Sequence, residues 1–293
     1  PVAGETPPSR FPLDVVQMDH TKVDIILVDP VDRHPIGRPW LTVAIDVFSR
    51  CIAGMYLSLE APSATSVGLW LVHVATDKAT WLAERGIKAN WPIHGKPRLV
   101  SVDNGAEFHS DAFERGCEQH AMTIDWRPPG MPHFGGIIER VIGSLMKLIH
   151  ELPGTTFSNP GERGDYDSSA TACLTLEELT HWLTIAISGF YHNRPHGGLS
   201  GETPLSRYRT GLAQLTASGN VPPTIQNPRA FLIDFLPIVR RTLQRNGITI
   251  DHVAYYSPAL NPWIVQSDKT RRLLIRRDPR DISRVYVFDP ETA

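Results

Sequence analysis

The sequence contains no long hydrophobic run, and this absence excludes a first class of protein. No stretch of 18 or more apolar residues occurs in the 293 residues, so we expect no membrane-spanning helix. The first residues, PVAGETPPSRFP, have no basic segment followed by an apolar one, which argues against a secretory signal peptide. They also lack an initiator methionine, so we expect the chain to be part of a longer protein.

Cysteine is scarce, and strong net charge is absent. The three cysteines, Cys51, Cys117 and Cys173, are widely spaced and odd in number, which is typical of reduced thiols rather than a disulfide framework. The formal net charge is −2, yet residues 220–293 carry 11 basic and 7 acidic side chains, a net of +4. The remaining residues have a net charge of −6. A basic C-terminal module beside an acidic region fits phosphate binding next to a carboxylate site, and scattered solvated charge is the alternative.

Turn-forming residues divide the chain into four parts. Residues 1–13 are rich in proline and polar, which predicts a linker or arm. A large domain is expected over 14–212, with a polar surface insertion at about 153–172. A linker over 213–230 then leads to short alternating runs over 231–293, which predict a small antiparallel β-barrel.

Within the large domain, apolar spacing predicts a mixed α/β arrangement. Strand-like runs lie at 14–29, 40–49, 51–60, 98–102 and 121–126, and helical ones at 64–85, 109–120, 137–152 and 174–193. The segment RPPGMPHFGG (127–136) contains three prolines and three glycines, which exclude regular structure there.

Three acidic residues occupy positions that suit a metal site. Asp19 lies in the middle of the first strand, and Asp103 follows the buried strand RLVSV. Glu139 falls in the first turn of the helix after the Gly-Gly pair, 35 residues beyond Asp103. An all-oxygen set of this kind suits Mg²⁺, with Mn²⁺ as substitute, and a pair of ions catalyses phosphoryl transfer.

Each carboxylate also has a simpler explanation. Asp103-Asn104-Gly105 is a common turn sequence, and Glu139 is a favourable charge at a helix N-terminus. Asp19 has the alternative of pairing with a buried arginine, and Asp46 in the second strand competes with it for the inward-facing role. The order of the elements, strand Asp, strand-end Asp, glycine-rich loop and helix Glu, favours the metal site.

Several motifs in this order resemble the DDE transposase and retroviral integrase superfamily. VDNGAEF (102–108) resembles its second-aspartate motif, and PHFGGIIER (132–140) its loop-plus-glutamate motif. The segments 36–63 and 191–208 look like the TnsB/TniA branch, which is related to phage Mu transposase. The resemblance implies an RNase H-like mixed five-stranded sheet flanked by helices, followed by a small barrel. It also implies that Asp19, Asp103 and Glu139 are the catalytic triad and bind two Mg²⁺ ions.

The resemblance further implies partners and a location. Double-stranded DNA, as transposon ends and target, is the expected substrate, bound by a homo-multimer of the protein. An ATPase that selects the target is an expected partner, and in some relatives a separate endonuclease. A bacterial cytoplasmic location on the nucleoid follows, with no membrane. No helix-turn-helix array for recognising transposon ends precedes residue 14, so the chain alone is expected to bind DNA without sequence specificity.

Several basic residues are candidates for contacts to the DNA backbone, with solvated surface charge as the simpler explanation. They are His133 in the glycine-rich loop, Arg140 and Lys147 on the following helix, and Arg240, Arg241, Arg271, Arg272, Arg276 and Arg277 in the C-terminal module.

Three functions compete at this point. The first is a transposase core that hydrolyses the phosphodiester at transposon 3′ ends and transfers the strand into target DNA. The second is an RNase H-like nuclease that cuts without joining, and the third is a catalytically silent DNA-binding scaffold. The intact triad favours an enzyme, because three clustered carboxylates are costly to retain without a role.

Overall fold

A mixed five-stranded sheet forms the centre of the computed structural model, which describes residues 8–128, 135–266 and 272–288. Its strands, in the spatial order β5-β4-β1-β6-β7, are β1 (Val15–Lys22), β4 (Trp40–Asp46), β5 (Ile52–Ser58), β6 (Leu99–Val102) and β7 (Thr123–Trp126). β4 is antiparallel to both β1 and β5, whereas β6 is parallel to β1 and β7. A small ladder of β2 (Leu27–Val28) and β3 (Pro35–Gly37) lies apart from it.

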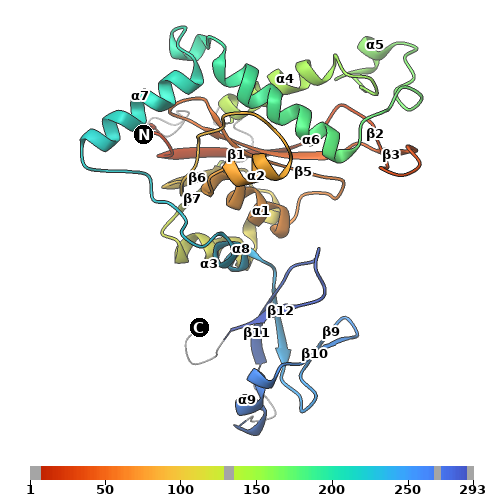
Figure 1. The fold of residues 1–293 in the computed structure, drawn as a ribbon, viewed down its shortest axis with the longest axis vertical. Helices are drawn as coiled ribbons and strands as arrows, with labels where there is room; N and C mark the ends of the chain where they lie inside the picture. The colour runs from red at the N-terminus through yellow and green to blue at the C-terminus, as the bar shows by residue number, and fades with distance from the viewer. Residues whose placement is uncertain (1–7, 129–134, 267–271, 289–293) are drawn as a thin grey trace.

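Helices cover both faces of this sheet, so the large domain has three layers (Figure 1). The helices are α1 (Ala64–Ala75), α2 (Ala79–Glu84), α3 (Asp111–Gln119), α4 (Gly136–Ile149), α5 (Pro160–Arg163), α6 (Leu176–Ile185), α7 (Pro204–Ala217), α8 (Pro228–Phe235) and α9 (Asn261–Gln266). α4, α6 and α7 lie on one face, and α1, α3 and α8 on the other (Figure 1). The expected RNase H-like class, a mixed five-stranded sheet flanked by helices, is confirmed.

Local sequence signals fix most helix ends. α6 begins at the expected capping box, in which the Thr175 hydroxyl accepts from the Glu178 N–H and the Glu178 carboxylate accepts from the Thr175 N–H. The single helix expected over 64–85 is instead two helices, α1 and α2. The chain turns extended at Thr76, and the fully buried Lys78 donates to the Ile93 carbonyl 2.6 Å away.

The chain changes face after α7, and α8 completes the main core. The segment between α7 and α8 passes the sheet (Figure 1), and the Lys96 N–H donates to the Pro223 carbonyl along the way. α8 then packs on α1 and α3, and its Phe231 and Phe235 belong to the same apolar core as the sheet. The carboxylate of Asp234 accepts a hydrogen bond from the His120 ring at 3.0 Å.

The C-terminal module consists of two small antiparallel sheets around a separate core. β8 (Ile238–Thr242), β11 (Arg272–Arg277) and β12 (Val285–Val287) form one sheet, and β9 (Ile248–Ile250) and β10 (Val253–Tyr255) the other. The closed barrel expected over 231–293 is not found among the described residues. The run 247–257 folds back on itself at Asp251 and His252, so β9 and β10 pair with each other rather than closing a barrel.

Within the described ranges, no helix combines the length and apolarity needed to cross a bilayer.

The packing of α8 on α3 gives a direct stability test. A Cβ added at Gly116 of α3 would lie 2.4 Å from the buried Phe235 ring, whereas one added at Gly143 of α4 meets nothing within 4 Å. We expect Gly116→Ala to lower the free energy of unfolding by about 1–3 kcal/mol through overpacking. Gly143→Ala, the matched control, should raise it by up to about 1 kcal/mol through helix propensity. Urea unfolding measures both, and a Gly116→Ala variant as stable as the parent would contradict the packing.

Candidate active site

Parallel pairing of β1 with β6 places two of the predicted carboxylates side by side. Val15, Val16 and Gln17 pair with Leu99, Val100 and Ser101 in unbroken register. Continued by two residues, this register puts Asp103 opposite Asp19. Asp103 directly follows the carboxyl end of β6, where the chain leaves the sheet and its side chain becomes exposed.

Glu139 reaches the same region from the helical layer. It lies in the first turn of α4, which packs across β1 and β4, and its side chain is exposed. The apolar residues Ile138, Val141 and Leu145 of this helix are buried against the sheet. Their spacing leaves Glu139 at the margin of the buried face.

The charges of Asp103 and Glu139 lie close enough to Asp19 to affect its pKa. The Asp19 side chain is 22% exposed, and its burial is the main cause of a raised pKa. The negative charges of Asp103 and Glu139 raise the pKa of Asp19 further. The Arg127 guanidinium and the His20 N–H act in the opposite direction on that pKa, without reversing its sign.

Arg127 is a positioning residue that the sequence did not reveal. Its side chain is nearly buried, and Nη2 lies 3.9 Å from Oδ2 of Asp19 while donating to the Met18 carbonyl at 3.0 Å. Its own carbonyl accepts a hydrogen bond from the Asn104 side chain at 2.9 Å. Arg127 therefore ties the strand of Asp19 to the turn of Asp103. A basic residue directly after a strand parallel to β6 was the one available signal.

A hydrogen bond within the turn after β6, and the packing of the His20 ring on Phe108, hold this turn in place. Oδ1 of Asp103 accepts the Gly105 N–H at 3.0 Å. The His20 ring stacks on Phe108 with centroids 5.1 Å apart and is 2.7 Å from the Thr42 hydroxyl. Burial lowers the pKa of His20 to about 4, which favours a neutral ring at pH 7, packed against Phe108.

Asp46 takes no part in this arrangement. It is fully buried, and its carboxylate accepts from the Leu13 N–H and from the N–H and hydroxyl of Ser49. Burial raises the pKa of Asp46 to about 6 in spite of these bonds. Asp46 therefore shapes the turn after β4.

The three carboxylates have the chemistry to bind a hard divalent cation, although their oxygen atoms are too far apart to hold one in this structure. Three carboxylates with one nearby guanidinium leave an excess of negative charge, which suits Mg²⁺ or Mn²⁺. Across the described ranges, no group of three or more acidic, His or Cys side chains is close enough to hold an ion. Metal binding therefore requires Asp103 and Glu139 to approach Asp19 more closely.

The predicted DNA contacts occupy scattered positions. Arg140 and Lys147 are exposed on α4, Arg240 and Arg241 on β8, and Arg272 on β11. Arg276 is buried and donates to the Leu236 carbonyl, so it does not face solvent. Arg277 forms an ion pair with Asp251. His133 and Arg271 lie outside the described residues.

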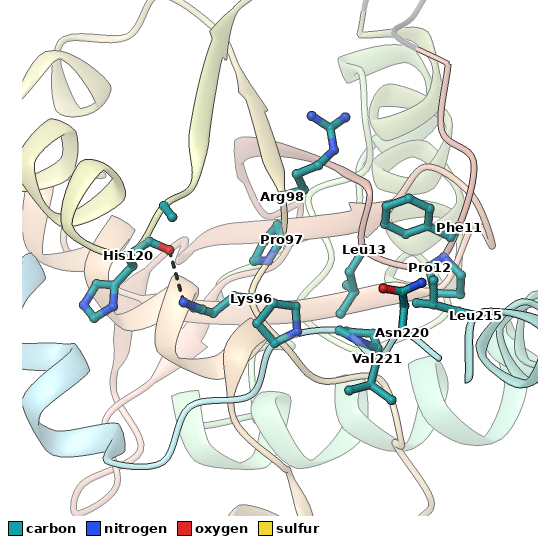
Figure 2. Close-up of a pocket in the computed structure, with 13 residues that line it drawn as sticks. Phe11, Pro12, Leu13, Lys96, Pro97, Arg98, His120, Leu215, Asn220 and Val221 are labelled. Atoms are coloured by element: carbon teal, nitrogen blue, oxygen red, sulfur yellow. Dashed lines mark hydrogen bonds between the residues drawn. The ribbon is translucent and has the colours of Figure 1, made fainter. Parts of the chain in front are cut away.

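A cavity of about 410 Å³ lies elsewhere, between the N-terminal segment and the chain that crosses the sheet (Figure 2). Its lining includes Phe11, Leu13, Val221 and two cations, and no acidic residue. The Lys96 ammonium donates to the His120 carbonyl, and Arg98 pairs with Asp14. Since its cations already have partners and it lacks carboxylates, this cavity is not the candidate active site.

Two family models match successive parts of the chain. Residues 17–154, which contain all three carboxylates, match the family model described as the TnsB C-terminal domain. Residues 233–293 match the C-terminal domain of Mu transposase. The chain is thus similar to TnsB over the first of these segments and to Mu transposase over the second. The TnsB/Mu resemblance seen in the motifs is thereby confirmed.

Two curated relatives extend these matches. The chain is 27% identical to the transposase for transposon Tn552 from Staphylococcus aureus, over 96% of the chain and 52% of that protein. It is 32% identical to the Tn7 transposition protein TnsB from Escherichia coli, over 59% of the chain and 25% of that protein. The chain thus spans about half or less of the length of these relatives.

Among solved structures, the chain is similar to the simian T-cell lymphotropic virus intasome in complex with PP2A regulatory subunit B56 gamma. That match has a TM-score of 0.47 and 13% identity, over 97% of this chain and 78% of the other. The integrase catalytic core domain of HTLV-2 in complex with magnesium (trimeric form) matches with a TM-score of 0.38 and 15% identity, over 68% and 97%.

The raised pKa of Asp19 predicts a stability trade-off. A carboxyl whose pKa is raised by folding stabilises the fold below its ordinary pKa of 3.8, and this contribution is lost as pH rises through the folded value. Asp19→Asn removes the charge, so we expect the variant to be more stable than the parent at pH 7 and to lose that advantage towards pH 4. Thermal unfolding across pH 4–7.5 measures the difference.

Glu151→Gln provides the control, because Glu151 is exposed just beyond the far end of α4. It should show no pH-dependent difference of this kind. An Asp19→Asn variant that is less stable than the parent at pH 7 would indicate that Asp19 is structural.

Proposed function

We propose that this chain is the catalytic core of a DNA transposase. It would hydrolyse the phosphodiester at transposon 3′ ends and direct the freed 3′-hydroxyl to attack target DNA. The observation that carries the proposal is the register of β1 with β6, which puts Asp103 opposite Asp19, with Glu139 of α4 close enough to affect the pKa of Asp19, in a segment that matches the TnsB C-terminal domain model. Joining is preferred to cutting alone because both relatives described above are transposition proteins.

Asp19 and Asp103 would share one Mg²⁺, and Glu139 would help to hold a second. When bound, such ions activate the attacking oxygen and stabilise the leaving oxygen. The chain's own residues prepare the site for them. Arg127 holds the strand of Asp19 and the turn of Asp103 together, and the packing of the His20 ring supports the same turn. The exposed Asp103 and Glu139 leave the site open to a strand of DNA.

The proposed substrates and partners follow from the same assignment. Double-stranded DNA would be bound at transposon ends and at the target, by several copies of the protein together. An ATPase that selects the target, and an endonuclease for the second strand, are partners consistent with the similarity to TnsB. The exposed cations of α4 and of the C-terminal module would contact the DNA backbone.

Glu139→Gln tests the chemistry in the full-length protein. We expect the variant to retain its fold and to lose strand joining by at least about 10³-fold, the scale on which loss of one member of a catalytic unit acts. The assay follows joined products made from a duplex with a labelled 3′-hydroxyl end, in Mg²⁺. Glu151→Gln, which makes the same chemical change at the other end of α4, should join normally.

The same assay separates the competing functions. Cleaved products without joined ones would identify a nuclease that cuts only. Equal joining by the parent and Glu139→Gln would remove Glu139 from the mechanism. DNA binding with neither product, in the parent as well, would leave a scaffold.

Metal binding is tested by stability, independently of activity. A ligand at ten times its dissociation constant stabilises the fold by about 1.4 kcal/mol, which raises the melting temperature of a domain of this size by about 3–6 °C. We expect such a rise on adding Mg²⁺ or Mn²⁺ to the parent chain and to Glu151→Gln, and none with Asp19→Asn. Anomalous scattering from a crystal soaked in Mn²⁺ would then locate the ion. Equal shifts in all three proteins would place the ion elsewhere.

A further inference from the structure

A second cavity, of about 320 Å³, opens at the start of α4, the helix that carries Glu139. Four parts of the chain line it: Pro8 and Ser9, the turn between β4 and β5, the start of α4, and the stretch 198–207 at the beginning of α7. Ile137 of the lining is two residues before Glu139. The cavity is distinct from the one in Figure 2, because the two have no lining residue in common.

Arg50 supplies the first cation of this cavity. It lies in the turn between β4 and β5 with a positive φ of 64°, and its side chain is half-buried. Its Nη1 atom is buried and has no hydrogen-bond partner among the described residues. The neighbouring carboxylate of Asp46 is already engaged by Leu13 and Ser49. A buried guanidinium nitrogen without an acceptor is costly, which indicates that an acceptor binds there from outside the chain.

Arg207 of α7 supplies the second cation. Its guanidinium lies over the Phe48 ring, 4.5 Å from the centroid, and this stacking fixes the plane of the group. Its Nε atom is also buried without a hydrogen-bond partner in the part of the chain that the structure describes. The nearest acid, Glu202, is 4.0 Å away and accepts a hydrogen bond from the Ser206 hydroxyl. The edge of the Arg207 guanidinium therefore retains donors for a further ligand.

Two further groups, Arg140 and His196, lie near Arg50, although neither lines the cavity. Arg140 follows Ile137 by three residues and so lies on the same side of α4. Burial lowers the pKa of His196, and the positive charges of Arg50 and Arg140 lower it further. The charge of Arg140 likewise opposes that of Arg50. Like charges are thus gathered here, with no close ion pair for Arg50 or Arg140 among the described residues.

We propose that Arg50, Arg207 and Arg140 bind a backbone phosphate of the DNA strand that enters the active site. Guanidinium groups match phosphate oxygens in geometry and charge. Donor atoms without acceptors distinguish this cavity from the one in Figure 2. Nη1 of Arg50 and Nε of Arg207 have no acceptor among the described residues, whereas Lys96 and Arg98 bind acceptors within the chain. The inference rests on the proposed function, because it takes the phosphate to be that of substrate DNA. The site would hold the strand beside Glu139.

The test measures DNA binding without metal, so that no cleavage is required. The full-length protein is compared with Arg50→Gln/Arg207→Gln and with Arg140→Gln, on short duplexes with a 3′-hydroxyl end. We expect the double variant to bind about tenfold more weakly, since hydrogen bonds to charged groups are being removed. The slope of log affinity against log salt should become shallower by about 1 for each phosphate that the variant no longer neutralises.

Neutral methylphosphonate groups, placed one at a time along the strand, locate the phosphate. One position should weaken binding by the parent and have no further effect on the double variant. Arg85→Gln is the matched control, because Arg85 also stacks on an aromatic ring, Trp81 at 4.4 Å, but lines another cavity. The Arg85→Gln variant should bind DNA with the affinity of the parent, and it should lose binding at the same methylphosphonate position as the parent. If the double variant fails to fold, the exposed Arg140→Gln carries the same comparison.

Two results would overturn the proposal. One is a folded double variant with the affinity, salt slope and methylphosphonate pattern of the parent. The other is stabilisation of the parent, but not of the variant, by inorganic phosphate, with no methylphosphonate position distinguishing them, since the site would then take a free anion. A protein inactive in joining that shows the expected pattern would reject the proposed chemistry alone. Normal joining with an unchanged pattern would reject this cavity alone.

Discussion

The parallel pairing of β1 with β6 is the constraint on which the candidate site depends. A parallel pair requires a long crossover, and here it contains four strands, β2 to β5, and two helices. In return, the pairing brings residues 84 positions apart in sequence, Asp19 and Asp103, to the same level of the sheet. A register slip of one residue would turn Asp19 to the other face of the strand. The buried side chains of Val16 and Met18 hold the register against that slip.

The charges around this pairing are in partial conflict. Asp19 is held in a partly buried place where Asp103 and Glu139 repel it, and Arg127 offsets only some of that cost. Near the start of α4, Arg50 and Arg140 repel each other. Each of these two sets of like charges is unfavourable by itself in the isolated chain. Both become favourable together when a cation and a phosphate are bound, which is what phosphodiester chemistry requires.

Sequence patterns predicted the elements of the site better than its partners. Alternation and strand ends placed Asp19 in a strand and Asp103 at a strand end, and helical periodicity placed Glu139 in the first turn of a helix, because each signal is local. The choice between Asp19 and Asp46 needed burial, which depends on how the turn after β4 folds over Leu13. Arg127 acts through contacts to two other strands, and its only local mark is its place directly after a strand. The prediction of a closed barrel was wrong for the same reason. Alternation predicts where strands lie, whereas barrel closure depends on which strands form hydrogen bonds with each other.

The position of α8 bears on how the protein would engage DNA. α8 packs on α1 and α3, and Arg240 of the following strand lies 3.6 Å from Asp111 of α3, so the C-terminal module adjoins that helical layer. α4, with Arg140, is on the opposite face of the sheet (Figure 1). A single DNA duplex that contacted both the C-terminal module and Arg140 of α4 would have to pass around the outside of the sheet. In the proposed multimer, two copies of the chain would remove this difficulty, because the C-terminal module of one copy would face the α4 of another.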